Sequence, residues 1–195
     1  MTELYDRLEE IRDVTRVLTR DVEQLRPLLG ERSIAAAVSE EEANRRFYVR
    51  AIFALIEALV EQHKRLLLDL AEHGTIALGT GVREALSERL YVFRDNGTVV
   101  EREQYLQLQR KIRAVYRTAE AAFEEALHVL FGDQGWASFQ QAVQVRDRLT
   151  HPKSLEDCSV DEDALEAVDR GHRWFRDLHN AFIRGAGAHR AQHHW

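Results

Sequence analysis

Cysteine, proline and glycine are scarce in this sequence, and each shortage excludes a class of protein. The 195 residues contain one cysteine, Cys158, so no disulfide can form within the chain. Two prolines and ten glycines stand among many leucine, alanine, glutamate and arginine residues, a composition typical of helices. A fold dominated by β-sheet is therefore not expected.

Long apolar runs are also missing. The most apolar stretch, residues 47–60, is interrupted by Arg50 and Glu57 and is too short to span a bilayer. The N-terminal residues are charged from Glu3 onward and lack the apolar core of a secretory signal. The sequence therefore predicts a cytoplasmic protein with no membrane partner.

Positive charge does not dominate either. The chain carries 27 Lys and Arg residues against 33 Asp and Glu residues, for a formal net charge of -6. Proteins that coat nucleic acid through bulk electrostatics are usually basic over the whole domain, so this class is excluded, whereas a small, locally basic site stays open. With 45% apolar residues, the chain has enough material for a real core and is the size of one ordinary domain or two small ones.

Apolar residues recur at helical spacing through the first part of the chain. In the first thirty residues they follow spacings of three and four, which predicts a long amphipathic helix that ends at Gly30. Its apolar stripe packs inside a bundle or, in the alternative interpretation, forms a coiled-coil seam with a second subunit. A second helix, expected from about Ser39 to Gly74, is apolar on almost every side between Phe47 and Val60, which predicts a place at the centre of a bundle.

The period changes at residues 90–101. Two runs of β-branched and aromatic residues flank Asn96-Gly97, a dipeptide suited to a two-residue hairpin turn. The sequence therefore predicts a small β-hairpin inserted into a helical fold. Because a two-stranded hairpin is rarely stable alone, we expect it to lean on the helices.

Three longer helices are expected in the second half of the chain. The first runs from about Val100 to Phe131 with Tyr105 on its apolar stripe, and the second covers residues 136–150. The last begins at a capping box formed by Ser159 and Glu162 and stops before two glycines.

These elements together define the predicted fold class as all-α, an antiparallel helical bundle with the small inserted hairpin. One domain is expected over residues 1–188, followed by a flexible tail over residues 189–195. The tail histidines lack a neighbouring carboxylate or cysteine, so no metal site is predicted there.

The stretch VRDRLTHPKS, residues 145–154, carries the candidate chemistry. A residue that precedes proline is disfavoured in helical geometry, so His151 is expected just past the last helical turn. Asp147 can then reach the His151 ring, where a carboxylate fixes the tautomer and raises the proton affinity, as suits general acid–base catalysis. Arg146 offers a planar fork of donors that matches a phosphate.

Arg148 and Lys153 add positive charge to this stretch, in which Asp147 is the only acid. A locally basic spot on an acidic chain favours phosphate-ester chemistry with neither a metal nor a cofactor. The same residues also suit a helix C-terminus whose cations compensate the helix dipole, and this alternative stays open.

Arg50 and Glu57 are seven residues apart on one face of the predicted central helix. A charge on such a helix is either paired or exposed to a functional cleft. Both side chains are therefore candidate supporting residues of the site, and structural pairing with neighbouring helices is an equally weighted alternative.

The segment RDRLTH, residues 146–151, resembles the R-x4-6-H signature of the HEPN superfamily, with a polar residue directly after the arginine. Similar proteins are α-helical bundles in which the motif ends a late helix and one more helix follows. The same order is predicted here over roughly residues 40–185, whereas the hairpin and the first helix lie outside that minimal bundle.

The resemblance implies a function. Many such proteins are metal-independent endoribonucleases of toxin–antitoxin, antiviral-defence and CRISPR-associated systems; others are scaffolds or nucleotide-binding modules. By this resemblance Arg146 binds the scissile phosphate, His151 transfers a proton and Asp147 orients them. The ribose 2′-hydroxyl then attacks the phosphate and leaves a cyclic end.

The resemblance also implies partners: RNA, held near Arg148 and Lys153; a second copy in a two-fold homodimer whose motifs share one cleft; and an antitoxin or other regulatory protein. Two alternatives stay open. The chain is a non-catalytic interaction or nucleotide-binding module, or a plain helical dimerisation protein in which the motif is a coincidence.

Overall fold

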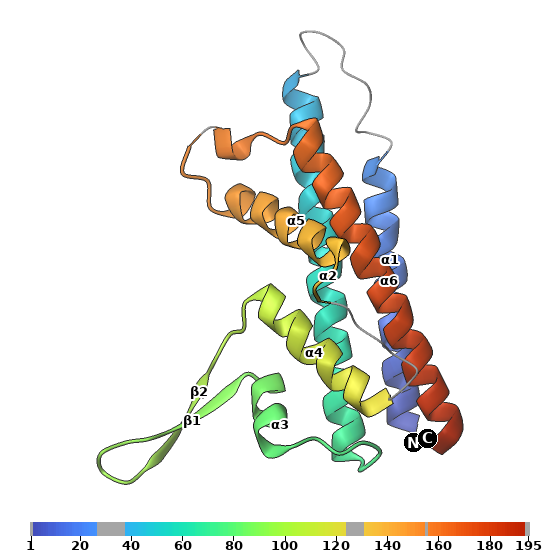
Figure 1. Ribbon diagram of the computed structural model, residues 1–195, viewed down its shortest axis with the longest axis vertical. Helices are drawn as coiled ribbons and strands as arrows, with labels where there is room; N and C mark the ends of the chain where they lie inside the picture. Colours follow the sequence, from blue (N-terminus) through green and yellow to red (C-terminus); the bar gives the residue numbers. More distant parts are fainter. Residues whose placement is uncertain (1, 27–37, 124–130, 155, 194–195) are drawn as a thin grey trace. The chain divides into compact units, whose positions relative to one another are not determined.

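The computed structural model describes residues 2–26, 38–123, 131–154 and 156–193 (Figure 1). Within these ranges the chain is mostly helical, which confirms the predicted all-α class with its inserted hairpin. The elements in chain order are α1 (Thr2–Leu25), α2 (Val38–Glu72), α3 (Thr80–Leu86), β1 (Arg89–Phe93), β2 (Val99–Glu103), α4 (Leu108–Phe123), α5 (Gln134–Thr150), the short 3-10 helix η3 (Glu156–Cys158) and α6 (Glu162–His193). Among these helices none is both long and apolar enough to cross a membrane.

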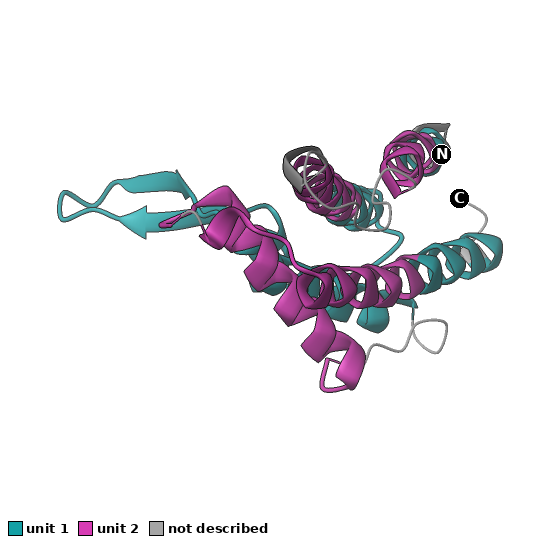
Figure 2. Ribbon diagram, turned by 90° about the horizontal axis from the view of Figure 1, so that it is seen from above, with its two compact units in different colours: residues 1–11, 60–129, 180–195 teal, residues 12–59, 130–179 magenta. Residues whose placement is uncertain are grey.

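Contacts divide the chain into two compact units, coloured separately in Figure 2. Unit 1 is assembled from Met1–Ile11, Val60–Val129 and Asn180–Trp195, and unit 2 from Arg12–Leu59 and Leu130–His179. Helices α1, α2 and α6 contribute residues to both units. The organisation as one domain over residues 1–188 stays a prediction.

Aromatic packing fixes the start of α5 within unit 2. Trp136 and Phe139 of α5 contact the Trp174 ring of α6, with ring centroids 5.3 and 5.2 Å from it. Gly135 allows this approach because a Cβ at that position would overlap Trp174. At Gly171 of α6 a Cβ would lie 2.9 Å from the Ala142 Cβ of α5. Glycine at these two positions therefore allows the two helices to pack closely.

The core of unit 1 contains a buried histidine. The His63 ring on α2 stacks on Phe182 with centroids 3.8 Å apart, and its Nδ1 lies 2.9 Å from the Tyr116 hydroxyl. Phe123 packs edge-on against Phe182 and lies close to Gly185, where a Cβ would be 3.1 Å from the Phe123 ring. Hydrogen bonding to a hydroxyl satisfies the polar ring atom, so His63 serves packing.

Both ends of α2 lie close to their predicted positions. The helix begins at Val38, one residue before the predicted start. It ends at Glu72, and Gly74 adopts φ +71°, a left-handed conformation that glycine adopts without strain after a helix. The predicted end near Gly74 is confirmed, whereas Gly30, the predicted end of the first helix, lies outside the described residues.

The prediction of a helix from Val100 was wrong, because residues 99–103 form β2 and α4 begins only at Leu108. Tyr105, assigned to the apolar stripe of that helix, lies in the connection and is 80% exposed. Its hydroxyl donates to Glu103 at 2.7 Å. Strand pairing with β1 outcompetes the helical period over this segment.

The last helix also differs from its prediction. Asp161 rather than Ser159 caps it, since the Asp161 carboxylate accepts from the Ala164 N–H at 2.8 Å. The helix passes through both glycines and continues to His193, so residues 189–193 of the expected flexible tail are helical. Ala186 and His189 are buried on this final stretch, and this packing outweighs the helix-weakening effect of glycine.

The hairpin has a different turn from the predicted one. Arg94 donates its N–H to the Thr98 carbonyl oxygen at 2.9 Å, and Gly97 donates to the Arg94 carbonyl oxygen at 2.9 Å. Asp95 and Asn96 are thus the turn centre, with Gly97 at φ +78° as a third loop residue. Such three-residue loops place glycine in the left-handed position, whereas the predicted two-residue turn would need two such residues.

Candidate functional site

Helix α5 carries the motif, and local sequence sets both of its ends. Asp133 caps the N-terminus by accepting a 2.8 Å hydrogen bond from the Trp136 N–H. At the other end, before Pro152, His151 leaves helical geometry with φ -129° and ψ 60°. Its N–H still donates to the Asp147 carbonyl oxygen at 3.0 Å. The predicted position of His151 past the last helical turn is confirmed.

Arg146 is held between two carboxylates in unit 2. One guanidinium nitrogen forms a short ion pair with Glu57 of α2, and the other donates to Asp147 at 3.0 Å. The Arg146 side chain is 28% exposed, compared with 43% for Glu57 and 55% for Asp147. The guanidinium is therefore fixed in direction but still open to solvent, where an anion can replace a carboxylate.

The predicted contact between the Asp147 carboxylate and the His151 ring does not form in the described structure. The carboxylate contacts Arg146, and no hydrogen bond joins it to the His151 ring within the described ranges. His151 is exposed, as are Pro152 and Lys153 after it. Since Asp147 is itself exposed, water competes for its carboxylate, and the ion pair with the adjacent arginine prevails over a contact with the imidazole.

The two outer cations of the motif have different surroundings. Arg148 donates to the Ser159 carbonyl oxygen at 3.1 Å, and its Nε is buried with no hydrogen-bond partner in the described structure. This arginine ties the loop after α5 to the helix. Lys153 is exposed, and its N–H donates to Asp157 at 2.7 Å in the same loop. Of the two, only the Lys153 side chain presents its charge fully to solvent.

Three residues on α2 reach the same region, and sequence reasoning identified two of them. Glu57 pairs with Arg146, and Arg50, itself exposed, donates to the Leu149 carbonyl oxygen at 3.4 Å near the end of α5. Arg46 donates to the Cys158 carbonyl oxygen at 3.3 Å and so holds the loop after the motif. Arg46 carries no signal in the sequence, since charged residues at the start of a helix are common on surfaces.

An exposed aromatic side chain also lies on this part of α2. Phe47 is 53% exposed and precedes Arg50 by three residues, so the two side chains stand on successive turns of one side of the helix. The sequence predicted this stretch to be at the centre of a bundle. Tyr48, Val49, Ile52 and Phe53 are indeed buried, but Phe47, Arg50 and Ala54 form an exposed stripe.

The structure thus brings Arg146, Asp147, Glu57 and Arg50 to the end of α5, with His151 directly after it. Groups of three or more His, Cys, Asp or Glu side chains that could hold a metal ion do not occur in the described parts of the chain.

Comparisons with known proteins return no match: no protein-family profile, no curated protein and no solved structure is similar to this chain at a significant level.

Proposed function

We propose that this protein is a metal-independent endoribonuclease of the HEPN type, acting as a toxin or antiviral-defence effector. The observation that carries the proposal is the end of α5, where Arg146 lies in a solvent-open carboxylate pair and His151 stands exposed beyond the last helical turn. One further helix, α6, follows, as in the family that the motif resembles.

The pairing of Arg146 supports a phosphate-binding role. A guanidinium held by Glu57 and Asp147 presents its planar fork in a set direction, and a phosphate offers the same bidentate geometry as the carboxylates that it would displace. Arg50 adds positive charge near the end of α5, where it donates to the Leu149 carbonyl oxygen, and the exposed Lys153 follows His151 by two residues in the sequence. Substrate binding then exchanges one charge-assisted pair for another at a preformed site.

Cleavage requires two proton transfers. The ribose 2′-hydroxyl loses its proton and its oxygen bonds to phosphorus, while the bond from phosphorus to the 5′-oxygen breaks and that oxygen gains a proton. His151 carries one of these protons, and Arg146 stabilises the charge that develops on the phosphate oxygens. In a two-fold homodimer the His151 of the second copy carries the other. The products are a 2′,3′-cyclic phosphate and a 5′-hydroxyl, so DNA is not cleaved.

The test is a cleavage time course on labelled single-stranded RNA in EDTA, with wild type, Arg146→Ala and His151→Ala. Arg117→Ala and His73→Ala are matched controls, since both side chains are exposed and neither belongs to the site. We expect cleavage with cyclic-phosphate ends in wild type and both controls, and a loss of at least a hundredfold in the two site variants. Equal cleavage by all five folded proteins would refute the assignment.

A second candidate function is a non-catalytic interaction or nucleotide-binding module. It is favoured by the contacts of Arg146 and Arg148, since both guanidinium groups already have partners within the chain. In this case wild type binds nucleotides or RNA with a dependence on Arg146 but leaves the RNA intact, and its expression does not slow the growth of the host. Growth arrest that His151→Ala relieves would instead favour the enzyme.

A further inference from the structure

The hairpin and its flanks carry most of the exposed large apolar side chains of the described residues. Six of the nine exposed large apolar side chains fall in this short part of unit 1: Val82, Leu90, Tyr91, Phe93, Val99 and Tyr105. Phe93 is 77% exposed. In Figure 1 the strands extend away from α3 and α4. The predicted leaning of the hairpin on the helices is thus limited to its base.

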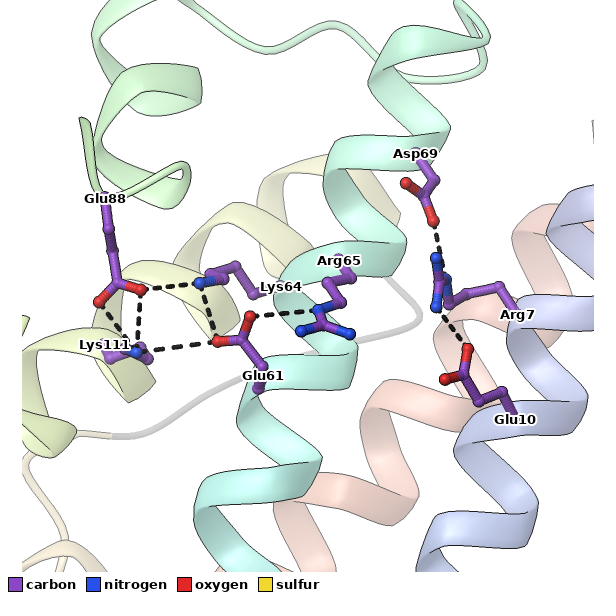
Figure 3. Close-up of polar contacts among 8 residues, drawn as sticks. All are labelled: Arg7, Glu10, Glu61, Lys64, Arg65, Asp69, Glu88 and Lys111. Carbon is purple, nitrogen blue, oxygen red and sulfur yellow. Dashed lines mark hydrogen bonds and ion pairs between the residues drawn. The ribbon is translucent and has the colours of Figure 1, made fainter. Parts of the chain in front are cut away.

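That base is firmly held. Glu88, the residue before β1, accepts hydrogen bonds from Lys64 at 2.8 Å, from Lys111 and from the Leu106 N–H at 3.1 Å, as Figure 3 shows for the two lysines. Its backbone has φ +54°, a conformation unfavourable for glutamate. Side chains from α2 and α4 therefore fix the direction in which an otherwise uncovered hairpin leaves the helices.

The outer edge of β1 has open main-chain groups. Hydrogen bonds from Arg94 to Thr98 and from Gln104 to Glu88 set the alternation of the antiparallel ladder, so the N–H and C=O groups of Arg89, Tyr91 and Phe93 point away from β2. By the same alternation the outward groups of β2 belong to Val99, Glu101 and Glu103. Each edge is a template for another strand.

We propose that β1 is the pairing edge of a homodimer, in which it meets β1 of a second copy antiparallel about Tyr91. This register places Tyr91 opposite Tyr91 of the second copy and Arg89 opposite Phe93, so no like charges meet and the cation faces an aromatic ring. Two hairpins become one four-stranded sheet, which relieves the instability of an isolated pair of strands.

The other edge is unsuited to self-pairing. Antiparallel pairing of β2 about its centre would set Glu101 opposite Glu101 of the second copy, and charged edge residues of this kind discourage association. Pairing β1 with β2 of another copy would be heterologous and would continue into fibres. Only the β1 pairing is both free of like charges and closed by a two-fold axis. It does not depend on the proposed ribonuclease activity.

Disulfide trapping tests this register. In a Cys158→Ser background, which removes the only native thiol, Tyr91→Cys places two cysteines at a hydrogen-bonded pair about 5.5 Å apart between Cα atoms, within the range of a disulfide. The matched control is Glu101→Cys at the facing position of β2. We expect Tyr91→Cys to form a species of twice the 22.6 kDa chain mass under mild oxidation, and Glu101→Cys to stay monomeric on a non-reducing gel.

A second pair of variants tests the main-chain hydrogen bonds of the proposed β1 interface. Tyr91→Pro removes an outward N–H without removing a bond to β2, and Glu101→Pro does the same on the other edge. Sedimentation at micromolar to submillimolar concentration should show a lower mass for Tyr91→Pro than for wild type and Glu101→Pro. A wild type that stays monomeric, a ladder of higher oligomers, or trapping that is equal at both positions would overturn the proposal.

Discussion

Glu57 on α2 and Arg146 on α5 form an ion pair, although the two residues are 89 positions apart in the chain. The pair fixes the direction of the guanidinium, which stays partly exposed. The contribution of the pair can be measured.

Replacing Glu57 by Gln should lower RNA cleavage by about tenfold, because Arg146 loses the carboxylate that orients it and small misplacements at a reacting centre are costly. The measurement is kcat and KM for the labelled RNA, alongside the melting temperature. Glu61→Gln is the control, because Glu61 lies on the same helix but pairs with Lys64 in unit 1. Unchanged cleavage with unchanged melting would remove Glu57 from the site.

Phe47→Ala should weaken the binding of single-stranded RNA if an unpaired base stacks on this exposed ring beside Arg50. Stacking of a base on an aromatic side chain contributes roughly 1–3 kcal/mol, or about five- to 150-fold in affinity. Fluorescence anisotropy of a labelled oligonucleotide measures the effect. Phe93→Ala, which removes an exposed ring from the hairpin, should leave the affinity unchanged.

Stability should fall between about pH 6.5 and pH 4. Burial lowers the pKa of His179 to about 4, and burial also lowers the pKa of His172 on the same helix. In this window the unfolded chain binds more protons than the folded one, so the stability present above the unfolded pKa is lost as the pH decreases. Thermal melts of wild type and His179→Gln at several pH values test this, since the variant should show a shallower decline.

Glu88→Gln should destabilise the protein by roughly 1–3 kcal/mol, the usual effect of leaving a buried charged donor incompletely paired. Burial alone would raise the pKa of Glu88, but the bonds from Lys64, Lys111 and the Leu106 N–H outweigh it and lower this pKa to about 2. The contribution is therefore present above the pKa of an unfolded glutamate and is lost toward pH 2. Urea titrations near neutral pH should show the loss, and Glu103→Gln, exposed on β2, should show none.

Two glycine substitutions should act in opposite directions. Gly135→Ala forces a methyl group into Trp174 and should destabilise unit 2, with overpacking costing typically 1–3 kcal/mol. Gly187→Ala, in an open position of α6, should stabilise the helix by roughly 0.5–1 kcal/mol. Opposite shifts in the midpoint of chemical unfolding would support the packing of α5 on α6, whereas equal shifts would contradict it.

Most of the helices, the hairpin and the end of α5 could be predicted from the sequence, because each depends on residues that are close together in the chain. The apolar period of α5 and the proline after His151 act within a few residues, and their outcome matches the prediction. The sequence also indicated that Arg50 and Glu57 have partners or face a cleft, because a charged residue within an apolar stretch of helix requires one or the other, and both have partners at α5.

Tertiary contacts decided the remainder. The continuation of α6 through two glycines follows from burial of Ala186 and His189, and the sequence pattern alone could not reveal that burial. The preference of Asp147 for Arg146 over His151 follows from the geometry of an exposed helix end. By itself the sequence determined most of the helical segments and where the candidate site residues lie along them. Only the fold decided which carboxylate holds Arg146, because that choice depends on residues brought together from distant parts of the chain.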